Sequence, residues 1–164
     1  MNLYLRWAGA AVIMVAALYT SREYSRFASR RLAQWRGFIS LLTHLEGEIS
    51  KFLARGEGLF RGFADAELEE CGFLQNLREG DGLLSAFEKC QSKLLLPREC
   101  KDALCEFFSS FGRSYKESEL ASLGAFRSSF EKEYEAEKER LEKSVKVTRT
   151  LLLGLALSVA ILLI

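Results

Sequence analysis

The apolar residues of this 164-residue chain are concentrated at its two ends, whereas its middle is dense in charge. No charged residue occurs in residues 7–19 or in residues 151–164. A helix that spans a membrane needs roughly 20 apolar residues, with about 17 as the lower limit. Both segments are short, but apolar residues before Arg6 lengthen the first one if this arginine snorkels. We therefore expect transmembrane helices at residues 3–20 and 150–164.

Three other interpretations of the two apolar segments stay open. In the first, Arg6 and the apolar run after it form a signal peptide that is cleaved. In the second, the C-terminal segment is a helix buried in a core, and in the third the two segments pair with each other in a soluble core. A retained span is favoured for the first segment, because arginines follow it at once and no clear small-x-small cleavage site does.

Basic residues flank each apolar segment on the side that faces the middle of the chain. They are Arg22, Arg26, Arg30, Arg31 and Arg36 after the first segment, and Lys138, Arg140, Lys143, Lys146 and Arg149 before the second. Cytoplasmic loops of membrane proteins carry such an excess of Lys and Arg. The pattern therefore predicts a two-pass protein of the cell membrane whose middle part, residues 21–149, is cytoplasmic.

The middle of the chain has a helical pattern throughout. Residues 26–55 carry apolar side chains at steps of three and four, as one face of a long helix does. Shorter segments follow, and Asp65, Asp81 and Pro97 are typical of helix starts. A last amphipathic helix runs from about Ser118 into the second apolar segment. The expected fold is all-α: a small cytosolic helical bundle framed by two long helices that continue into the terminal spans.

The apolar positions also bound two of the shorter helices. We expect one helix from Asp65 to Gly80, with these residues on its inner face: Leu68, Cys71, Leu74 and Leu77. We expect another from Pro97 to Gly112, with these residues on its inner face: Cys100, Leu104, Phe107, Phe108 and Phe111.

No arrangement of side chains in the sequence indicates catalysis. The single histidine, His44, lies beside the apolar stripe and does not match the HExxH pattern of zinc enzymes. The acidic run of alternate residues from Glu131 to Glu139 is spread around a helix, which is typical of a solvated face rather than a metal site. We expect a non-enzyme without catalytic, metal or cofactor-binding residues. A net charge of +1 also argues against nucleic-acid binding.

The four cysteines are interpreted as small core residues. Cys71, Cys90, Cys100 and Cys105 follow one another at intervals of 19, 10 and 5 residues, and no CxxC motif occurs. A zinc or thioredoxin-type site is therefore only weakly supported. The even number would permit two disulfides, but a reducing cytosol disfavours them.

Two terminal apolar helices around a helical middle of this length resemble the stage III sporulation protein AB family of endospore-forming bacteria. Leu-Glu-Gly-Glu-Ile at residues 45–49 is similar to the L-E-x-E-I of the family's first cytosolic helix. Phe-Gly at residues 111–112 is similar to the start of the family stretch F-G-x-x-L-G-x-x-D-x-x-x-Q. Gly154 and the Ile-Leu-Leu-Ile of residues 161–164 resemble the family's C-terminal ending.

The chain departs from the family pattern within that stretch. Tyr115 and Lys116 stand where the family has Leu-Gly. Glu119 replaces the aspartate, and Leu123 replaces the glutamine. Thr150 stands where the family usually has another glycine, four residues before Gly154.

The resemblance implies a structural role. The family belongs to a channel or secretion-like complex between mother cell and forespore, and its cytosolic domain is similar to that of type II secretion inner-membrane platform proteins. The implied partners are a secretion-type ATPase, other membrane proteins of the sporulation complex and the lipid bilayer, with residues 21–149 on the mother-cell side. Independently of the resemblance, residues 131–142 are a candidate docking face, because their charges exceed what pairing within the helix needs. The alternative is a generic two-span membrane scaffold that forms a homo-oligomer through its long helices.

Overall fold

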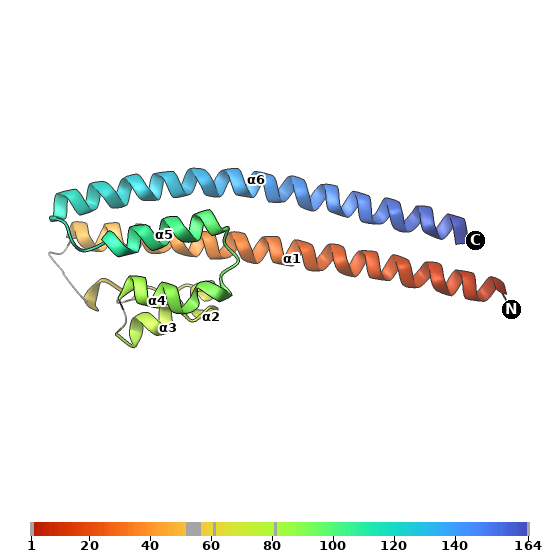
Figure 1. Ribbon diagram of the computed structural model, residues 1–164, viewed down its shortest axis with the longest axis horizontal. Coiled ribbons are helices and arrows are strands. Elements are labelled where there is room, and N and C mark those ends of the chain that lie inside the picture. The colour runs from red at the N-terminus through yellow and green to blue at the C-terminus, as the bar shows by residue number, and fades with distance from the viewer. Residues whose placement is uncertain (1, 52–56, 61, 81, 164) are drawn as a thin grey trace. The chain divides into compact units, whose positions relative to one another are not determined.

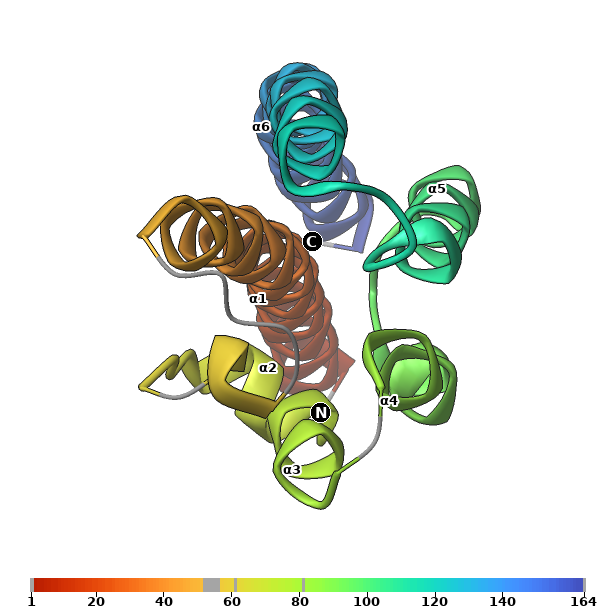
Figure 2. The same cartoon turned by 90° about the vertical axis from the view of Figure 1, so that its left-hand side faces the viewer.

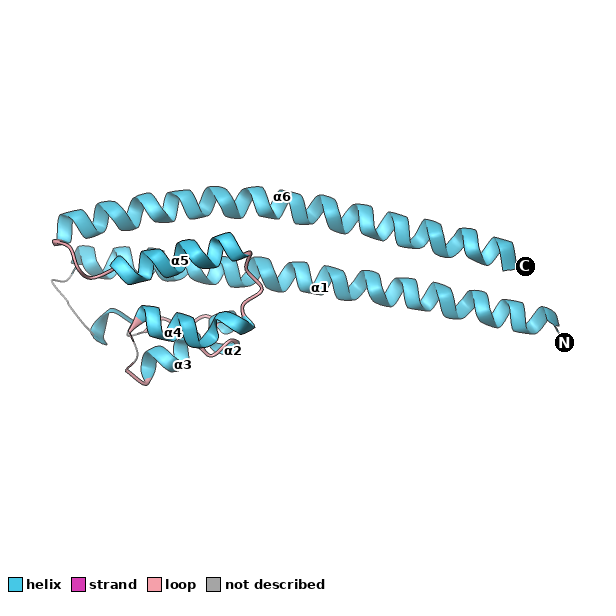
Figure 3. Ribbon diagram, viewed as in Figure 1, coloured by secondary structure: helices cyan, strands magenta, loops and turns pink. Residues whose placement is uncertain are grey.

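The computed structural model describes residues 2–51, 57–60, 62–80 and 82–163, and every regular element within these ranges is helical. In chain order the α-helices are α1 (Asn2–Lys51), α2 (Ala66–Glu70), α3 (Phe73–Arg78), α4 (Leu83–Cys90), α5 (Arg98–Ser110) and α6 (Lys116–Leu163) (Figures 1 and 3). Two 3-10 helices, η1 (Glu57–Phe60) and η2 (Gln91–Lys93), lie between them. The helical part of the expected fold is thereby confirmed for the described residues.

The two transmembrane spans expected at residues 3–20 and 150–164 are wrong. Across the described ranges, no helix combines the length and the apolar character that crossing a membrane requires. Helices α1 and α6 are long, but their uncharged runs at residues 7–19 and 151–163 cover only about two-thirds of the roughly 20 apolar residues of a span. The expected cytoplasmic location and the contact with a bilayer depended on these spans and stay predictions.

The chain divides into two compact units, which we call the terminal unit and the central unit. The terminal unit consists of Met1–Ser29 and Ala136–Ile164, and the central unit is Arg30–Glu135. Helices α1 and α6 each supply a part of both units.

In the terminal unit the outer parts of α1 and α6 pack against each other. Most of its buried apolar side chains are small, which lets two helices approach closely: Ala10, Ala28, Leu141 and Ala156. The hydroxyl oxygens of Tyr24 and Ser144 share a hydrogen bond of 2.7 Å between the two helices.

The central unit is built around an aromatic core. The ring of Phe38 on α1 lies at its centre, with centroids 5.4 Å from Phe73 on α3, 5.8 Å from Phe87 on α4 and 6.4 Å from Phe108 on α5. Helices α2 to α5 follow one another around this interior (Figure 2). Each helix thus contributes its apolar face to one common core, as the helical periodicity predicts.

The helix expected from Asp65 to Gly80 is two helices in the structure. Its start is confirmed, because Oδ1 of Asp65 accepts the backbone N–H of Glu67 at 3.1 Å and that of Leu68 at 3.0 Å. Gly72 then interrupts the helix with a φ of 87°, a conformation that glycine adopts at little cost. This bend gives α3 a different direction from α2, and Phe73 at its start is fully buried in the core.

Helix α5 agrees with its prediction. It follows Pro97 and buries the expected face: Cys100, Leu104, Phe107 and Phe108. Phe111, the residue after the helix, is half-buried against the core. The helix start expected at Asp81 lies outside the described residues.

One glycine of α1 marks a close approach between helices. A Cβ at Gly37 would lie 2.8 Å from Oδ1 of Asp65 and 3.0 Å from Cγ of Leu68. Both distances are shorter than carbon contacts normally allow. The absence of a side chain at Gly37 therefore permits the N-terminus of α2 to pack directly on α1.

Candidate interaction surface

The turn that joins α5 to α6 is held by a buried carboxylate. Oε1 of Glu119 accepts the backbone N–H of Gly112 at 3.0 Å, and Oε2 accepts that of Ser114 at 3.3 Å. Gly112 has a φ of 82°, which reverses the chain after α5. Only 8% of Glu119 is exposed, so the charge acts on these two donors rather than on water.

Tyr115 projects from this fixed turn. Its exposed fraction is 83%, and it is the only large apolar side chain of the central unit that is mainly exposed among the described residues. Lys116 follows it, and Nζ of Lys116 donates to the carbonyl oxygen of Ser50 at 3.1 Å, which ties the start of α6 to the end of α1. The turn thus presents one aromatic side chain on a backbone that is braced from two sides.

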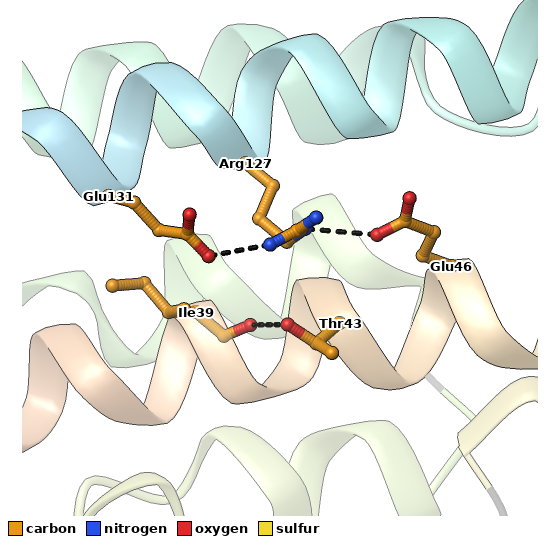
Figure 4. A network of polar contacts seen from close by, with 5 residues as sticks. All are labelled: Ile39, Thr43, Glu46, Arg127 and Glu131. Atoms are coloured by element: carbon orange, nitrogen blue, oxygen red, sulfur yellow. Dashed lines mark hydrogen bonds and ion pairs between the residues drawn. The ribbon is translucent and has the colours of Figure 1, made fainter.

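A polar bridge joins α1 to α6 within the central unit. Nε of Arg127 donates to Oε2 of Glu46 at 2.9 Å, and Nη1 donates to Oε1 of Glu131 at 2.6 Å (Figure 4). The hydrogen bond with Glu131 is the main reason why the pKa of Arg127 is raised above its usual value. Arg127 is therefore a fixed cation that positions the two long helices, rather than a mobile charge for a ligand.

The acidic stretch proposed as a docking face is partly occupied by its own neighbours. Glu131 is engaged by Arg127, as described above. Glu139 lies 2.7 Å from Nζ of Lys143, in the i,i+4 order that favours such pairs, and this lysine lowers the pKa of Glu139. Glu135 and Glu137 also have interaction partners. These contacts fit the solvated-face interpretation better than a row of charges that await a partner.

His44 lies at the edge of the core, as expected. Its ring centroid is 5.3 Å from that of Phe63. Nε2 is buried without a hydrogen-bond partner in the described structure. The contact with Phe63 gives the imidazole ring a packing role at the edge of the core.

Other concave or ligand-rich features are scarce in the described part of the molecule. A shallow groove on α1 is lined entirely by Ala11, Val12, Val15, Ala16 and Tyr19, which bring no charged group to it. Within the described residues, no three His, Cys, Asp or Glu side chains are placed to hold a metal ion. The most distinctive surface feature of the central unit is thus the turn that carries Tyr115.

The comparison with known protein families identifies the chain. The family described as stage III sporulation protein AB matches residues 6–164. The chain belongs to the stage III sporulation protein AB family. No curated protein and no solved structure matched it in the corresponding comparisons.

The motifs that resemble those of the family have clear positions in the structure. Within residues 45–49, Leu45 and Ile49 enter the core, and Glu46 forms the bridge to Arg127. At residues 111–112 the Phe-Gly pair ends α5 and starts the turn. The motifs therefore mark the packing of α1 and the reversal between α5 and α6.

The departures from the family pattern also have structural consequences. Glu119, in the place of the family's aspartate, provides the carboxylate that holds the turn. Leu123, in the place of the glutamine, is fully buried in the core. Tyr115 supplies the exposed ring. The sequence alone reveals these three substitutions, whereas their roles depend on the distances and the burial in the structure.

Proposed function

We propose that this protein is a non-enzymatic structural component of a sporulation complex, and that its central unit docks a secretion-type ATPase. Membership of a stage III sporulation protein family supports a role in sporulation. The docking role is favoured by an interior that is filled with apolar side chains, together with an exposed aromatic anchor. An ATPase is the partner implied by the resemblance of the chain to its family.

The observation that carries the proposal is the exposure of Tyr115 on a rigid turn. Tyrosine is enriched among the residues that dominate binding energies at protein interfaces. A tyrosine that is 83% exposed gains little packing energy in the isolated protein, and its ring can bury most of its surface in a pocket of the partner. The Glu119 contacts fix the backbone beforehand, which reduces the ordering cost of binding.

Charge has a secondary role in this proposal. Interface charges chiefly increase association rates and select partners. We place the anchor at Tyr115 rather than on residues 131–142, because Glu131 and Glu139 already form ion pairs on α6. The acidic stretch then keeps the helix solvated. Its contribution to binding is at most a long-range attraction that speeds association with the partner.

A pull-down with purified full chain and the secretion-type ATPase of the same organism tests the docking role. The ATPase should be retained at low salt and at high salt, because an apolar anchor dominates. Reversing Glu133, Glu135 and Glu137 to Lys should leave most of the binding intact. Loss of binding in this triple variant, with its helicity unchanged, would move the docking face to the acidic stretch. Failure of the parent chain to retain the ATPase under both conditions would contradict the proposal.

A second candidate function is self-association through the terminal unit. Large apolar side chains of α1 and α6 are exposed there: Val12, Val15, Tyr19, Val147, Leu151 and Leu155. Two helices alone cannot cover such faces, and a second copy could do so. Sedimentation of the full chain distinguishes the candidates, because a scaffold of this kind gives a concentration-dependent oligomer that Leu151→Glu together with Val15→Glu dissociates.

A further inference from the structure

Arg113 lies in the middle of the turn between α5 and α6, two residues before Tyr115. The backbone N–H groups of its neighbours, Gly112 and Ser114, both donate to the carboxylate of Glu119, at 3.0 Å and 3.3 Å. The backbone at Arg113 is therefore fixed on both sides, while Arg113 itself is exposed. The turn thus presents two side chains, an arginine and a tyrosine, on one braced segment.

The side chain of Arg113 forms no ion pair and no hydrogen bond with any residue that the structure describes. The other arginines of the central unit within the described ranges each have an interaction partner: Arg30, Arg31, Arg36, Arg78, Arg98 and Arg127. A guanidinium group without a partner keeps its five N–H donors for a ligand. Arg113 is therefore a cation that the central unit holds in place but does not use for its own packing.

The guanidinium group of Arg113 determines the chemistry that it can recognise. Its N–H donors form a planar fork that matches a carboxylate, and its positive charge does not depend on pH in the physiological range. Lys116, on the other side of Tyr115, adds a second positive charge, and its hydrogen bond to the carbonyl oxygen of Ser50 does not neutralise this charge. Arginine and tyrosine are both enriched among the residues that dominate binding energies. The turn is therefore suited to a surface that combines an apolar pocket with an acidic group.

We propose that the partner carries an aspartate or glutamate beside the pocket that accepts Tyr115, and that Arg113 forms an ion pair with this carboxylate. The inference rests on the proposed docking through Tyr115 and adds to it a residue that determines specificity. A partner with a neutral or basic residue at this place is rejected, because binding would desolvate the guanidinium group without a counter-charge. Nucleic acid is a poorer match, because it is bound through many basic side chains, whereas the net charge of the chain is only +1.

Calorimetric titration of the full chain with the secretion-type ATPase of the same organism tests the ion pair through its salt dependence. Arg113→Ala should raise Kd about fivefold at low salt, where an ion pair is least screened, and by a smaller factor at high salt. Tyr115→Ala should raise Kd by a similar factor at both salt concentrations, because an apolar anchor is not screened. Because Arg113 has no partner among the described residues, Arg113→Ala should keep the thermal midpoint of the parent chain.

Arg98→Ala is the matched control. It removes the same charge at the other end of α5, where the side chain of Arg98 is 93% exposed and its Nε lies 3.9 Å from Oδ2 of Asp102. We expect the Kd of Arg98→Ala to equal that of the parent chain at both salt concentrations. An equal rise in Kd for Arg98→Ala and Arg113→Ala would show that only the net charge matters, and it would overturn the ion pair.

A cross-linking experiment locates the carboxylate directly. Arg113→Lys places a primary amine at the proposed contact, and a water-soluble carbodiimide joins an amine to a carboxylate that touches it. We expect mass spectrometry to find position 113 of this variant joined to an aspartate or glutamate of the ATPase. The parent chain cannot form this link, because the guanidinium group does not react in this way.

The outcomes separate the ion pair from the docking role on which it rests. If Arg113→Ala binds like the parent chain while Tyr115→Ala binds more weakly, the ion pair is overturned and docking through Tyr115 stands. A complex of the Arg113→Lys chain that gives no cross-link from position 113 to the ATPase overturns the ion pair in the same way. If the parent chain itself does not bind the ATPase, the docking role fails and the ion pair fails with it.

Discussion

The buried carboxylate of Glu119 accepts the backbone N–H of Gly112 at 3.0 Å, across the turn between α5 and α6. A side chain in the first turns of one helix thereby fixes the end of the preceding helix. The exposed Tyr115 lies on this same turn, between Ser114 and Lys116.

Replacing Glu119 should weaken the fold. Glu119→Ala removes the acceptor of two N–H groups. A hydrogen bond to a charged group contributes about 1.5–3 kcal/mol to the stability of a protein, and less where water can take the place of the lost acceptor. Because Gly112 and Ser114 are exposed to water, we expect a loss of about 1–3 kcal/mol in the free energy of unfolding. Urea unfolding of the full chain, followed by circular dichroism, measures it.

Glu117→Ala is the matched control, since Glu117 is exposed in the first turn of the same helix. It should cost less than about 1 kcal/mol, through the helix dipole alone. Equal losses in both variants would show that Glu119 acts only through the dipole and not through the turn.

A methyl group at Gly37 should destabilise the central unit. Gly37→Ala gains about 1 kcal/mol of helix propensity, but its Cβ meets the Asp65 carboxylate that caps α2. We expect a net loss of stability, because either α1 must move away from α2 or the cap must break. Gly47→Ala, in the same helix and with open space around it, should instead stabilise the protein. Thermal unfolding of the two variants should therefore give shifts of opposite sign.

The bridge between α1 and α6 should be stronger than an ordinary surface ion pair. Arg127 and Glu46 are both partly shielded, and Arg127 is also held by Glu131. A double-mutant cycle with alanine at Arg127 and Glu46 should give a coupling energy of about 1 kcal/mol. The exposed pair of Arg26 and Glu23 serves as the reference and should give less than about 0.5 kcal/mol. Indistinguishable couplings would remove the positioning role from Arg127.

The buried thiols of Cys71 and Cys90 should make stability depend on pH. The folded pKa of Cys71, about 7, lies below its unfolded value of 9.0, so the unfolded state binds more protons between these values and stability rises with pH there. The raised pKa of Cys90 has the opposite effect above pH 9, where the unfolded thiol ionises and the folded one does not. Urea unfolding under reducing conditions should show that the stability of the parent relative to Cys71→Ala rises between about pH 7 and pH 9. A difference that is independent of pH would contradict the lowered pKa of Cys71.

Much of the fold follows from local sequence signals. Asp65 caps α2 because its short side chain reaches the first N–H groups, and the apolar steps after Pro97 place Phe107 and Phe108 in the core. Such features depend on residues that are near one another in the chain. They can therefore be predicted without knowledge of the tertiary structure.

The remaining features depend on contacts between distant segments. The apolar segments at the two ends favour membrane spans in the sequence, but no helix of the described residues is long and apolar enough to be one. The packing of α1 and α6 in the terminal unit, where Ala28 is buried, depends on residues more than 100 positions apart. Gly72 lies inside a helical pattern, and only its φ of 87° shows that the helix breaks.

The docking role is tested most directly by calorimetric titration of the full chain with its secretion-type ATPase, using Tyr115→Ala and Tyr19→Ala as a pair. Tyr19 is also exposed, but it lies in the terminal unit. Loss of a central aromatic anchor typically costs 2 kcal/mol or more, which is about a thirtyfold increase in Kd. We expect this increase for Tyr115→Ala and an unchanged Kd for Tyr19→Ala. Equal affinities of the parent and both variants would contradict docking through Tyr115.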